Sequence, residues 1–141
     1  MPKKNKVHIQ FESSSINEAF ARVTVSAFIS QLDPTVEELY DIKMAISEAV
    51  TNCIIHGYEN REGLITVNCA YEDRQVQIEV IDEGKGIANV DEAMAALYTT
   101  SLDEERAGLG FTVMQSMMDQ VEVISQLGKG TTVKMKRILA D

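Results

Sequence analysis

A carboxylate and an amide one helical turn apart are the first residues in this chain that suggest chemistry. Glu48 and Asn52 are four residues apart, and His56 follows four further on, so the three share one face of a predicted helix. The amide oxygen of Asn52 can bind Mg²⁺, which usually takes few protein ligands. The carboxylate of Glu48 can accept a proton from a hydroxyl or a water beside a phosphoryl group. Taken alone, the pattern also fits a solvated polar helix face.

Glycine-containing motifs come later in the chain and suggest a nucleotide pocket. Asp82 ends an alternating strand pattern and is followed by Gly84 and Gly86. A carboxylate there can accept a hydrogen bond from an exocyclic amine such as adenine N6, and the glycines permit positive φ and a close approach to a flat ring. Gly108 and Gly110 precede a predicted helix, whose free N–H groups would bind an anion. Each motif alone also fits an ordinary turn or flexible loop.

An arginine and a pair of threonines near these motifs complete the candidate set. Arg106 lies just before the second glycine pair and can add a charge-assisted contact to a phosphate. Thr131 and Thr132 begin a strand, so one of the two hydroxyls can point toward Asp82. Neither glycine pair completes a dinucleotide-binding G-x-G-x-x-G, and the chain has no G-x-x-x-x-G-K-[ST], so a P-loop is excluded.

The periodicity of the apolar residues predicts the elements that position these groups. Alternation predicts strands and a 3.6-residue repeat predicts helices. Phe20 and Val23 are expected on the inner side of the first helix, with Arg22 facing solvent. The class is α+β, with helices on one face of a mixed, mostly antiparallel sheet. The predicted strands are 7–12, 64–71, 76–81, 121–126 and 131–138, the predicted helices 16–31, 33–57, 91–97 and 111–120, and 98–107 is predicted to be a loop.

Length, charge and composition restrict the functional class. The 141 residues suit a single domain over 1–141, with an apolar fraction of 45%. No apolar run reaches the ~18 residues that cross a bilayer, and no apolar segment follows the basic N-terminus, so we expect a cytoplasmic protein without membrane contact. A net charge of −9 argues against direct nucleic-acid binding but suits a basic protein partner. The two cysteines, Cys53 and Cys69, are expected as reduced core thiols.

Together, these motifs resemble the GHKL ATP-binding family, which includes gyrase, MutL and histidine kinases. Its N-box resembles Glu48 to Asn52, its first glycine box Asp82 to Gly86, its second Gly108 to Gly110, and its third Gly130 to Thr132. The resemblance covers nearly the whole chain and is strongest to the small anti-sigma factor serine kinases of spore-forming bacteria. The segment 17–25 and the segment 47–58 carry that closer resemblance.

The resemblance implies a role for each residue of the site. Glu48 would be the general base, Asn52 the Mg²⁺ ligand and Asp82 the residue that reads adenine in ATP or ADP. By the same match, the other nucleotide-binding residues would be Gly84 and Gly86 at the base, Arg106, Gly108 and Gly110 over the phosphates, and Thr132 in support of the adenine contact. Ala88 replaces a proline that often follows Gly-Ile in the family, which affects only loop stiffness.

The resemblance also implies partners. It predicts a homodimer that binds and inhibits a sporulation sigma factor, and that phosphorylates a serine on an anti-anti-sigma antagonist. Arg22 matches the helix position expected to bind both proteins. Three alternatives share the pocket: a histidine kinase catalytic domain, a gyrase- or MutL-like ATPase module, and a non-catalytic, nucleotide-regulated binding module. The first needs a phosphoacceptor histidine on an upstream hairpin, whereas His8 lies in a predicted strand and His56 in the site helix.

Overall fold

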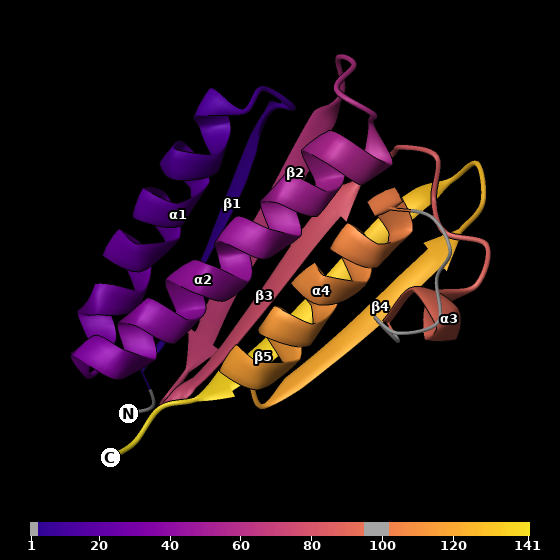
Figure 1. The fold of residues 1–141 in the computed structure, drawn as a ribbon. Coiled ribbons are helices and arrows are strands. Elements are labelled where there is room, and N and C mark those ends of the chain that lie inside the picture. Colours follow the sequence, from indigo (N-terminus) through magenta and orange to yellow (C-terminus); the bar gives the residue numbers. More distant parts are fainter. Residues whose placement is uncertain (1–2, 95–101) are drawn as a thin grey trace.

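A five-stranded sheet forms one layer of the protein (Figure 1). The computed structural model describes residues 3–94 and 102–141, and only the backbone of 102–108. Every neighbouring pair of strands is antiparallel, and their order is β1-β2-β3-β5-β4. The expected strands are therefore confirmed, in a fully antiparallel arrangement. They are β1 (Lys4–Glu12), β2 (Leu64–Glu72), β3 (Gln75–Asp82), β4 (Gln120–Gln126) and β5 (Gly130–Ile138).

Helices cover only one face of this sheet. In Figure 1 the three long helices lie side by side in the order α1, α2, α4, and the short α3 lies beside β4. The α2 helix continues into a single π-helical stretch that ends at Gly57, as the sequence predicted for the end of that helix. The helices are α1 (Ile16–Ile29), α2 (Val36–Asn52), α3 (Val90–Met94) and α4 (Leu102–Met117), with a 3₁₀ turn at Ser30–Leu32 and the π stretch at Cys53–Gly57.

The core lies between the helices and the sheet. The apolar stripe predicted on α2 is confirmed, because Ile42, Ile46, Ala49 and Cys53 are all buried. From the sheet, the inner residues of β3 alternate with outer ones and end at Asp82, a polar residue in a buried position. The core thus brings the polar end of β3 under the C-terminal end of α2, where the candidate site lies.

The start of α2 differs from the sequence prediction. Thr35, rather than Asp33, is the N-cap, and its hydroxyl accepts a hydrogen bond from the Glu38 backbone at 3.0 Å while the Glu38 carboxylate accepts one from the Thr35 backbone at 2.9 Å. This reciprocal pair is a capping box. Asp33 instead adopts a left-handed conformation with φ of 50° between the two helices.

The orientation of α1 also corrects the prediction. Phe20 and Val23 are 51% and 63% exposed, whereas Ala21 and Val25 fill the inner positions. The helix is therefore rotated so that Ile16, Phe20 and Val23, spaced i, i+4, i+7, form an exposed apolar stripe. The apolar periodicity was correct, but this helix has apolar residues on two sides and only tertiary packing decided which one faces the sheet.

The segment before the Met-rich helix corrects a third prediction. The expected helix 111–120 begins at Leu102 and ends at Met117, so 102–107 is helical rather than loop. Residues 102–107 include Leu, Glu, Arg and Ala, which favour helix, and this preference outweighs the two glycines that follow. The short helix expected at 91–97 is found at Val90–Met94, and residues 95–101, part of the expected loop, lie outside the described residues.

Candidate functional site

The adenine-reading candidate, Asp82, lies at the end of β3 and is only 5% exposed. Its Oδ1 accepts a hydrogen bond from the Gly84 N–H at 2.9 Å. Burial raises the pKa of the Asp82 carboxyl above its usual value, while hydrogen bonds from Gly84, from the Cys53 thiol and from the Thr131 backbone act in the opposite direction. A carboxylate has about four acceptor positions, so these donors leave acceptor capacity for a ligand.

Backbone approaches around Asp82 explain the glycines. A Cβ on Gly57 would lie 2.9 Å from Asp82 Cγ, and one on Gly84 would lie 2.2 Å from the Gly57 carbonyl oxygen. Gly86 has a φ of 73°, and a Cβ on it would lie 2.1 Å from the Gln126 carbonyl oxygen. A side chain at Gly57 would displace the Asp82 carboxylate, and one at Gly84 or Gly86 would displace backbone, so the three glycines build the wall of the site. Sequence reasoning treated Gly57 only as a helix terminator and missed this role.

A serine that sequence reasoning missed ties the first glycine loop to the turn between β4 and β5. Ser125 Oγ accepts a hydrogen bond from the Ile87 N–H at 2.8 Å and donates to the Gly130 carbonyl at 3.0 Å. The Gly128 N–H also donates to the Lys85 carbonyl at 2.6 Å. The alternation of β4 could have identified this residue, because Ser125 is a polar residue at an inward position that continues Val121 and Val123.

The strand register decides which threonine accompanies Asp82. Thr131 is the cross-strand partner of Asp82, and Thr132 is the partner of Ile81. Since cross-strand partners share a face, Thr131 lies on the helix side with Asp82 and is buried, while Thr132 lies on the opposite face. The register therefore places Thr131, and not Thr132 as expected, on the face of Asp82, and a threonine contact to adenine stays a prediction.

The Glu48 and Asn52 side chains lie where α2 meets α4. A Cβ on Gly110 would lie 3.1 Å from both Glu48 Oε2 and Asn52 Nδ2, so α4 passes very close to both groups. Burial, and secondarily the negative charge of Glu18, raise the pKa of the Glu48 carboxyl. The Asn52 amide nitrogen is buried and has no hydrogen-bond partner among the described residues. An unpaired buried amide is costly and indicates a place for a ligand.

The second glycine pair is not arranged as the sequence predicted. Gly108 and Gly110 lie inside α4 instead of before it. Inside a helix their N–H groups bond to carbonyls one turn back and are not free for an anion. The side chain of Arg106 lies outside the described residues, so its phosphate contact, like those of both glycines, stays a prediction.

Comparison with known proteins identifies the fold family. The family model for the histidine kinase-like ATPase domain matches residues 11–137. The chain belongs to this family. The anti-sigma F factor of Caldanaerobacter subterraneus subsp. tengcongensis is 58% identical over 139 residues, covering 99% of this chain and 97% of that protein. Those of Clostridium acetobutylicum and Bacillus cereus (strain G9842) are 56% and 52% identical over 137 and 139 residues, covering 97% and 98% of this chain and 96% and 95% of theirs.

Solved structures share the fold at low sequence identity. The RsbU and RsbW domains of a Mycobacterium tuberculosis protein match with a TM-score of 0.71 at 21% identity, over 97% of this chain and 33% of that one. A histidine kinase domain from Erythrobacter litoralis matches with a TM-score of 0.57 at 19% identity, over 86% of this chain and 60% of that one. Both likenesses confirm the α+β fold expected of a histidine kinase-like ATPase.

The Arg22 side chain lies beside Glu18 on the first helix of this histidine kinase-like ATPase. Arg22 Nε lies 3.8 Å from Glu18 Oε1, and its side chain is 41% exposed. The negative charge of Glu18 raises the pKa of Glu48, so the polar side of α1 faces the catalytic candidate. Arg22 is thus partly exposed, as predicted, and its role in binding partner proteins stays a prediction.

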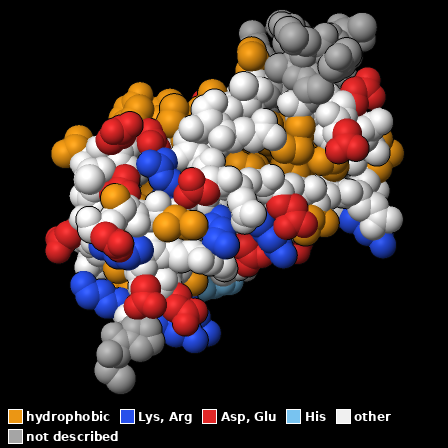
Figure 2. Space-filling model, turned by 90° about the horizontal axis from the view of Figure 1, so that it is seen from below, with side chains coloured by type: hydrophobic (Ala, Val, Ile, Leu, Met, Phe, Trp, Pro, Cys, Tyr) orange, Lys and Arg blue, Asp and Glu red, His pale blue; other side chains and the backbone are white. Residues whose placement is uncertain are grey.

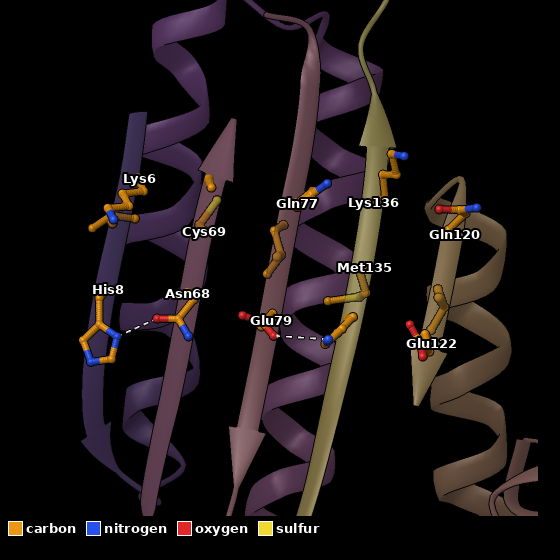
Figure 3. Close-up of a pocket in the computed structure, with 15 residues that line it drawn as sticks. Lys6, His8, Asn68, Cys69, Gln77, Glu79, Gln120, Glu122, Met135 and Lys136 are labelled. Atoms are coloured by element: carbon orange, nitrogen blue, oxygen red, sulfur yellow. Dashed lines mark hydrogen bonds and ion pairs between the residues drawn. The ribbon is translucent and has the colours of Figure 1, made fainter. Parts of the chain in front are cut away.

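A separate hollow lies on the sheet face that the helices leave open (Figure 3). It has a volume of about 1110 Å³ and is lined by charged and polar side chains. His8 Nδ1 lies 2.5 Å from Asn68 Oδ1, and Lys134 Nζ lies 3.9 Å from Glu79 Oε2 across neighbouring strands. None of the candidate nucleotide residues lines this hollow. Among the described residues, no helix has the length and apolar character to span a membrane.

Proposed function

We propose that this protein is a cytoplasmic anti-sigma factor that binds a sporulation sigma factor and uses Mg-ATP to phosphorylate a serine on its anti-anti-sigma antagonist. The observation that carries the proposal is the 58% identity to an anti-sigma F factor over 99% of the chain. At this identity over full length, the relatives' binding function transfers with the fold. The serine kinase activity, Mg²⁺ and dimerisation need support from the site itself.

The position of Glu48 supports serine kinase chemistry. In the proposed reaction the serine oxygen bonds to the γ-phosphorus of ATP, the bond from that phosphorus to the β,γ-bridging oxygen breaks, and Glu48 takes the hydroxyl proton. A carboxyl whose pKa is raised by burial is better matched to accepting a proton near neutral pH than an exposed one. An intact Glu48 argues against a binding module without catalysis.

Asn52 fits the proposed metal. Its amide lies beside Glu48, and the buried amide nitrogen has no hydrogen-bond partner in the described part of the chain, so no hydrogen bond from that nitrogen fixes which way the amide faces. Mg²⁺, when bound, would neutralise phosphate charge. The donor set is suitable because Mg²⁺ takes few protein ligands and completes its shell with phosphate oxygens and water.

The exposed stripe of α1 supports the proposed sigma-factor surface. Ile16, Phe20 and Val23 expose apolar area beside Arg22, and apolar patches next to charge are typical of protein-binding surfaces. The net charge of −9 would assist association with a basic sigma factor and make it slower at high salt. On the face shown in Figure 2, acidic and basic side chains are interspersed, so this attraction comes from the overall charge.

The uncovered sheet face is available for the proposed homodimer. Its mixed lining, with Lys134, Glu79 and His8, offers complementary charges to a second copy (Figure 3). Lys134→Glu would place a second carboxylate beside Glu79 and should convert dimer to monomer in sedimentation equilibrium. A wild-type monomer would refute the homodimer, and a dimer that survives the substitution would place the interface elsewhere.

A combined binding and phosphotransfer assay tests the function. Purified protein with Mg-ATP and a candidate antagonist should yield phosphoserine, and the ADP or ATP form should bind the sigma factor. Release of free phosphate without phosphoserine would instead favour the ATPase-module alternative, and phosphohistidine the histidine kinase alternative. Arg22→Glu should weaken binding to both partner proteins, whereas Arg61→Glu, an exposed cation outside α1, should not. Normal sigma-factor binding by Arg22→Glu would exclude this surface.

A further inference from the structure

The phenol of Tyr58 joins two segments that meet next to Asp82. Its hydroxyl accepts a hydrogen bond from the Glu83 backbone N–H at 2.7 Å and donates one to the Leu64 carbonyl at 2.5 Å. The first contact is to the residue directly after Asp82 in the chain, and the second is to the first residue of β2. A single side-chain oxygen thus connects the end of β3 to the beginning of β2.

The ring of Tyr58 packs against the backbone of Gly63. Gly63 lies against it so closely that a Cβ there would be 2.4 to 2.5 Å from three ring carbons. Only glycine at this position lets the ring lie flat against the backbone. The hydroxyl therefore occupies one fixed place, because both its ring and its two hydrogen-bond partners are constrained.

The protonation state of the phenol suits this double contact. Burial raises the pKa of the Tyr58 hydroxyl, and the nearby charge of Asp82 raises it further, against the opposing effect of the Glu83 N–H. The group therefore keeps its proton at neutral pH, donates to Leu64 and accepts from Glu83 at the same time. A phenylalanine would preserve the packing but make neither contact.

The stretch after Asp82 has few other restraints of this kind. Gly84 N–H bonds back to Asp82 itself, and Lys85 N–H bonds to the Gly57 carbonyl at 2.9 Å. The Glu83 N–H points to Tyr58 alone among the hydrogen bonds described. The N–H side of the peptide between Asp82 and Glu83 is thus held by the phenol, while Asp82 itself is paired with Ile65 of β2 and Thr131 of β5 in the sheet.

We propose that Tyr58 is a positioning residue for base recognition: its hydroxyl fixes the Asp82–Glu83 peptide so that the Asp82 carboxylate faces the amine of adenine. The inference rests on the proposed function, in which Asp82 reads adenine. Tyr58 does not itself touch the nucleotide in this account. Its effect should appear in the choice between bases, whereas a purely structural role would affect stability alone or all nucleotides equally.

Tyr58→Phe tests the inference by removing only the hydroxyl. We expect the Kd for ATP to rise about three- to tenfold, the range that corresponds to one lost hydrogen bond. The Kd for inosine triphosphate, which has a carbonyl in place of the amine, should change little, so the ratio of the two affinities falls. Isothermal titration calorimetry with both nucleotides gives the ratio, and thermal melting confirms that the variant is folded.

Tyr71→Phe is the matched control. Tyr71 is a buried tyrosine, its hydroxyl donates to Gln31 Oε1 at 2.6 Å, and it lies near the far end of β2 from Leu64. This variant loses one hydroxyl contact of the same kind but should keep the wild-type affinity ratio. An equal change of the ratio in both variants, or an unchanged ratio in Tyr58→Phe, would overturn the inference.

Gly63→Ala provides an independent route to the same result. The added methyl group would displace the Tyr58 ring and so move the hydroxyl without altering it chemically. We expect the same fall in the affinity ratio, and an unchanged ratio in a folded Gly63→Ala protein would count against the inference. A wild-type protein that binds ATP and inosine triphosphate equally would instead refute the proposed function of Asp82, which separates the two failures.

Discussion

The two ends of the candidate site differ in how completely the fold builds them. At the base end, Asp82 is enclosed by the backbones of Gly57 and Gly84, and the loop behind it is fastened by Ser125 and Tyr58. At the phosphate end, Asn52 keeps a buried amide nitrogen without a partner in the described chain, and Gly110 lies inside a helix. The base end is preorganised by hydrogen bonds, and the phosphate end is not.

This difference indicates which half of the site must rearrange when a nucleotide binds. Backbone-to-backbone contacts such as those at Gly84 are fixed by the sheet and exist without nucleotide. The N–H groups expected to hold phosphate belong to the glycines of α4 and are occupied by helical hydrogen bonds. Binding of phosphate by those groups therefore requires the first turns of α4 to unwind, at a cost that the phosphate contacts must exceed.

Removing the proton acceptor should give the largest effect. Glu48→Gln keeps the shape of the phosphate end but cannot take a proton, so we expect phosphotransfer to slow by roughly 10²- to 10⁴-fold. Binding of Mg-ATP should stay close to wild type. Radiolabelled phosphate transfer to the antagonist and calorimetry measure the two quantities. Glu37→Gln, an exposed carboxylate in the first turn of α2, is the control, and full kinase activity in Glu48→Gln would remove Glu48 as the base.

Changing the base reader should give the next largest effect. Asp82→Asn should weaken ATP binding by ~1–3 kcal/mol, the worth of a buried hydrogen bond to a charged group, or roughly 5- to 150-fold in Kd. Wild type should prefer ATP to GTP, because guanine presents a carbonyl where adenine presents an amine. Glu83→Gln, its exposed neighbour, should bind ATP normally. Equal wild-type affinity for ATP and GTP would contradict the assignment.

Asp82→Asn should weaken ATP binding but stabilise the nucleotide-free fold. Burial raises the pKa of Asp82 in the folded protein, so its ionised form destabilises the fold at pH values above its usual 3.8. The penalty disappears as pH falls through the raised folded pKa. Nucleotide-free Asp82→Asn should therefore melt at a higher temperature than wild type at pH 7. A lower melting temperature would show that the charge is compensated.

A methyl group between α2 and α4 should give a smaller effect confined to the phosphate end. In Gly110→Ala the new Cβ meets Glu48 and Asn52 at 3.1 Å, while alanine favours the helix by up to ~1 kcal/mol. We expect phosphotransfer to fall about tenfold through misplacement of the two groups, without loss of thermal stability. Leu109→Ala, an exposed neighbour, is the control. Unchanged kinetics would show that α4 does not hold this position during catalysis.

The smallest expected effect concerns pH. Burial, and then the charge of Glu18, raise the pKa of Glu48, so the acidic limb of the pH–rate profile should lie above the usual glutamate value of 4.5. Glu18→Gln removes one of the two causes and should move that limb to lower pH. The rate at the optimum should be retained. A limb that does not move would show that burial alone sets the pKa of Glu48.

Much of the fold was predictable because local patterns and tertiary packing agree. Each strand alternates and each long helix has an apolar stripe, and Ile42, Ile46 and Ala49 lie where the stripe of α2 predicted. The prediction failed where the local sequence fits two conformations or two orientations equally well. The helix α1 carries apolar residues on two sides, so Phe20 was placed inward although it is exposed. The segment before Gly108 has helix-forming residues next to glycines, and the helix preference of those residues outweighs the glycines.

The sequence by itself determined the chemical inventory of the site: a carboxylate and amide one turn apart, an aspartate at a strand end, and two glycines directly after that aspartate. These follow from residue type and spacing, which are local properties. Only the tertiary structure decided that Thr131 rather than Thr132 accompanies Asp82, because the face of a residue depends on strand register. It alone also brought Tyr58, Ser125 and Gly57 to the base end, since their contacts join segments distant in sequence whose closeness no local pattern encodes.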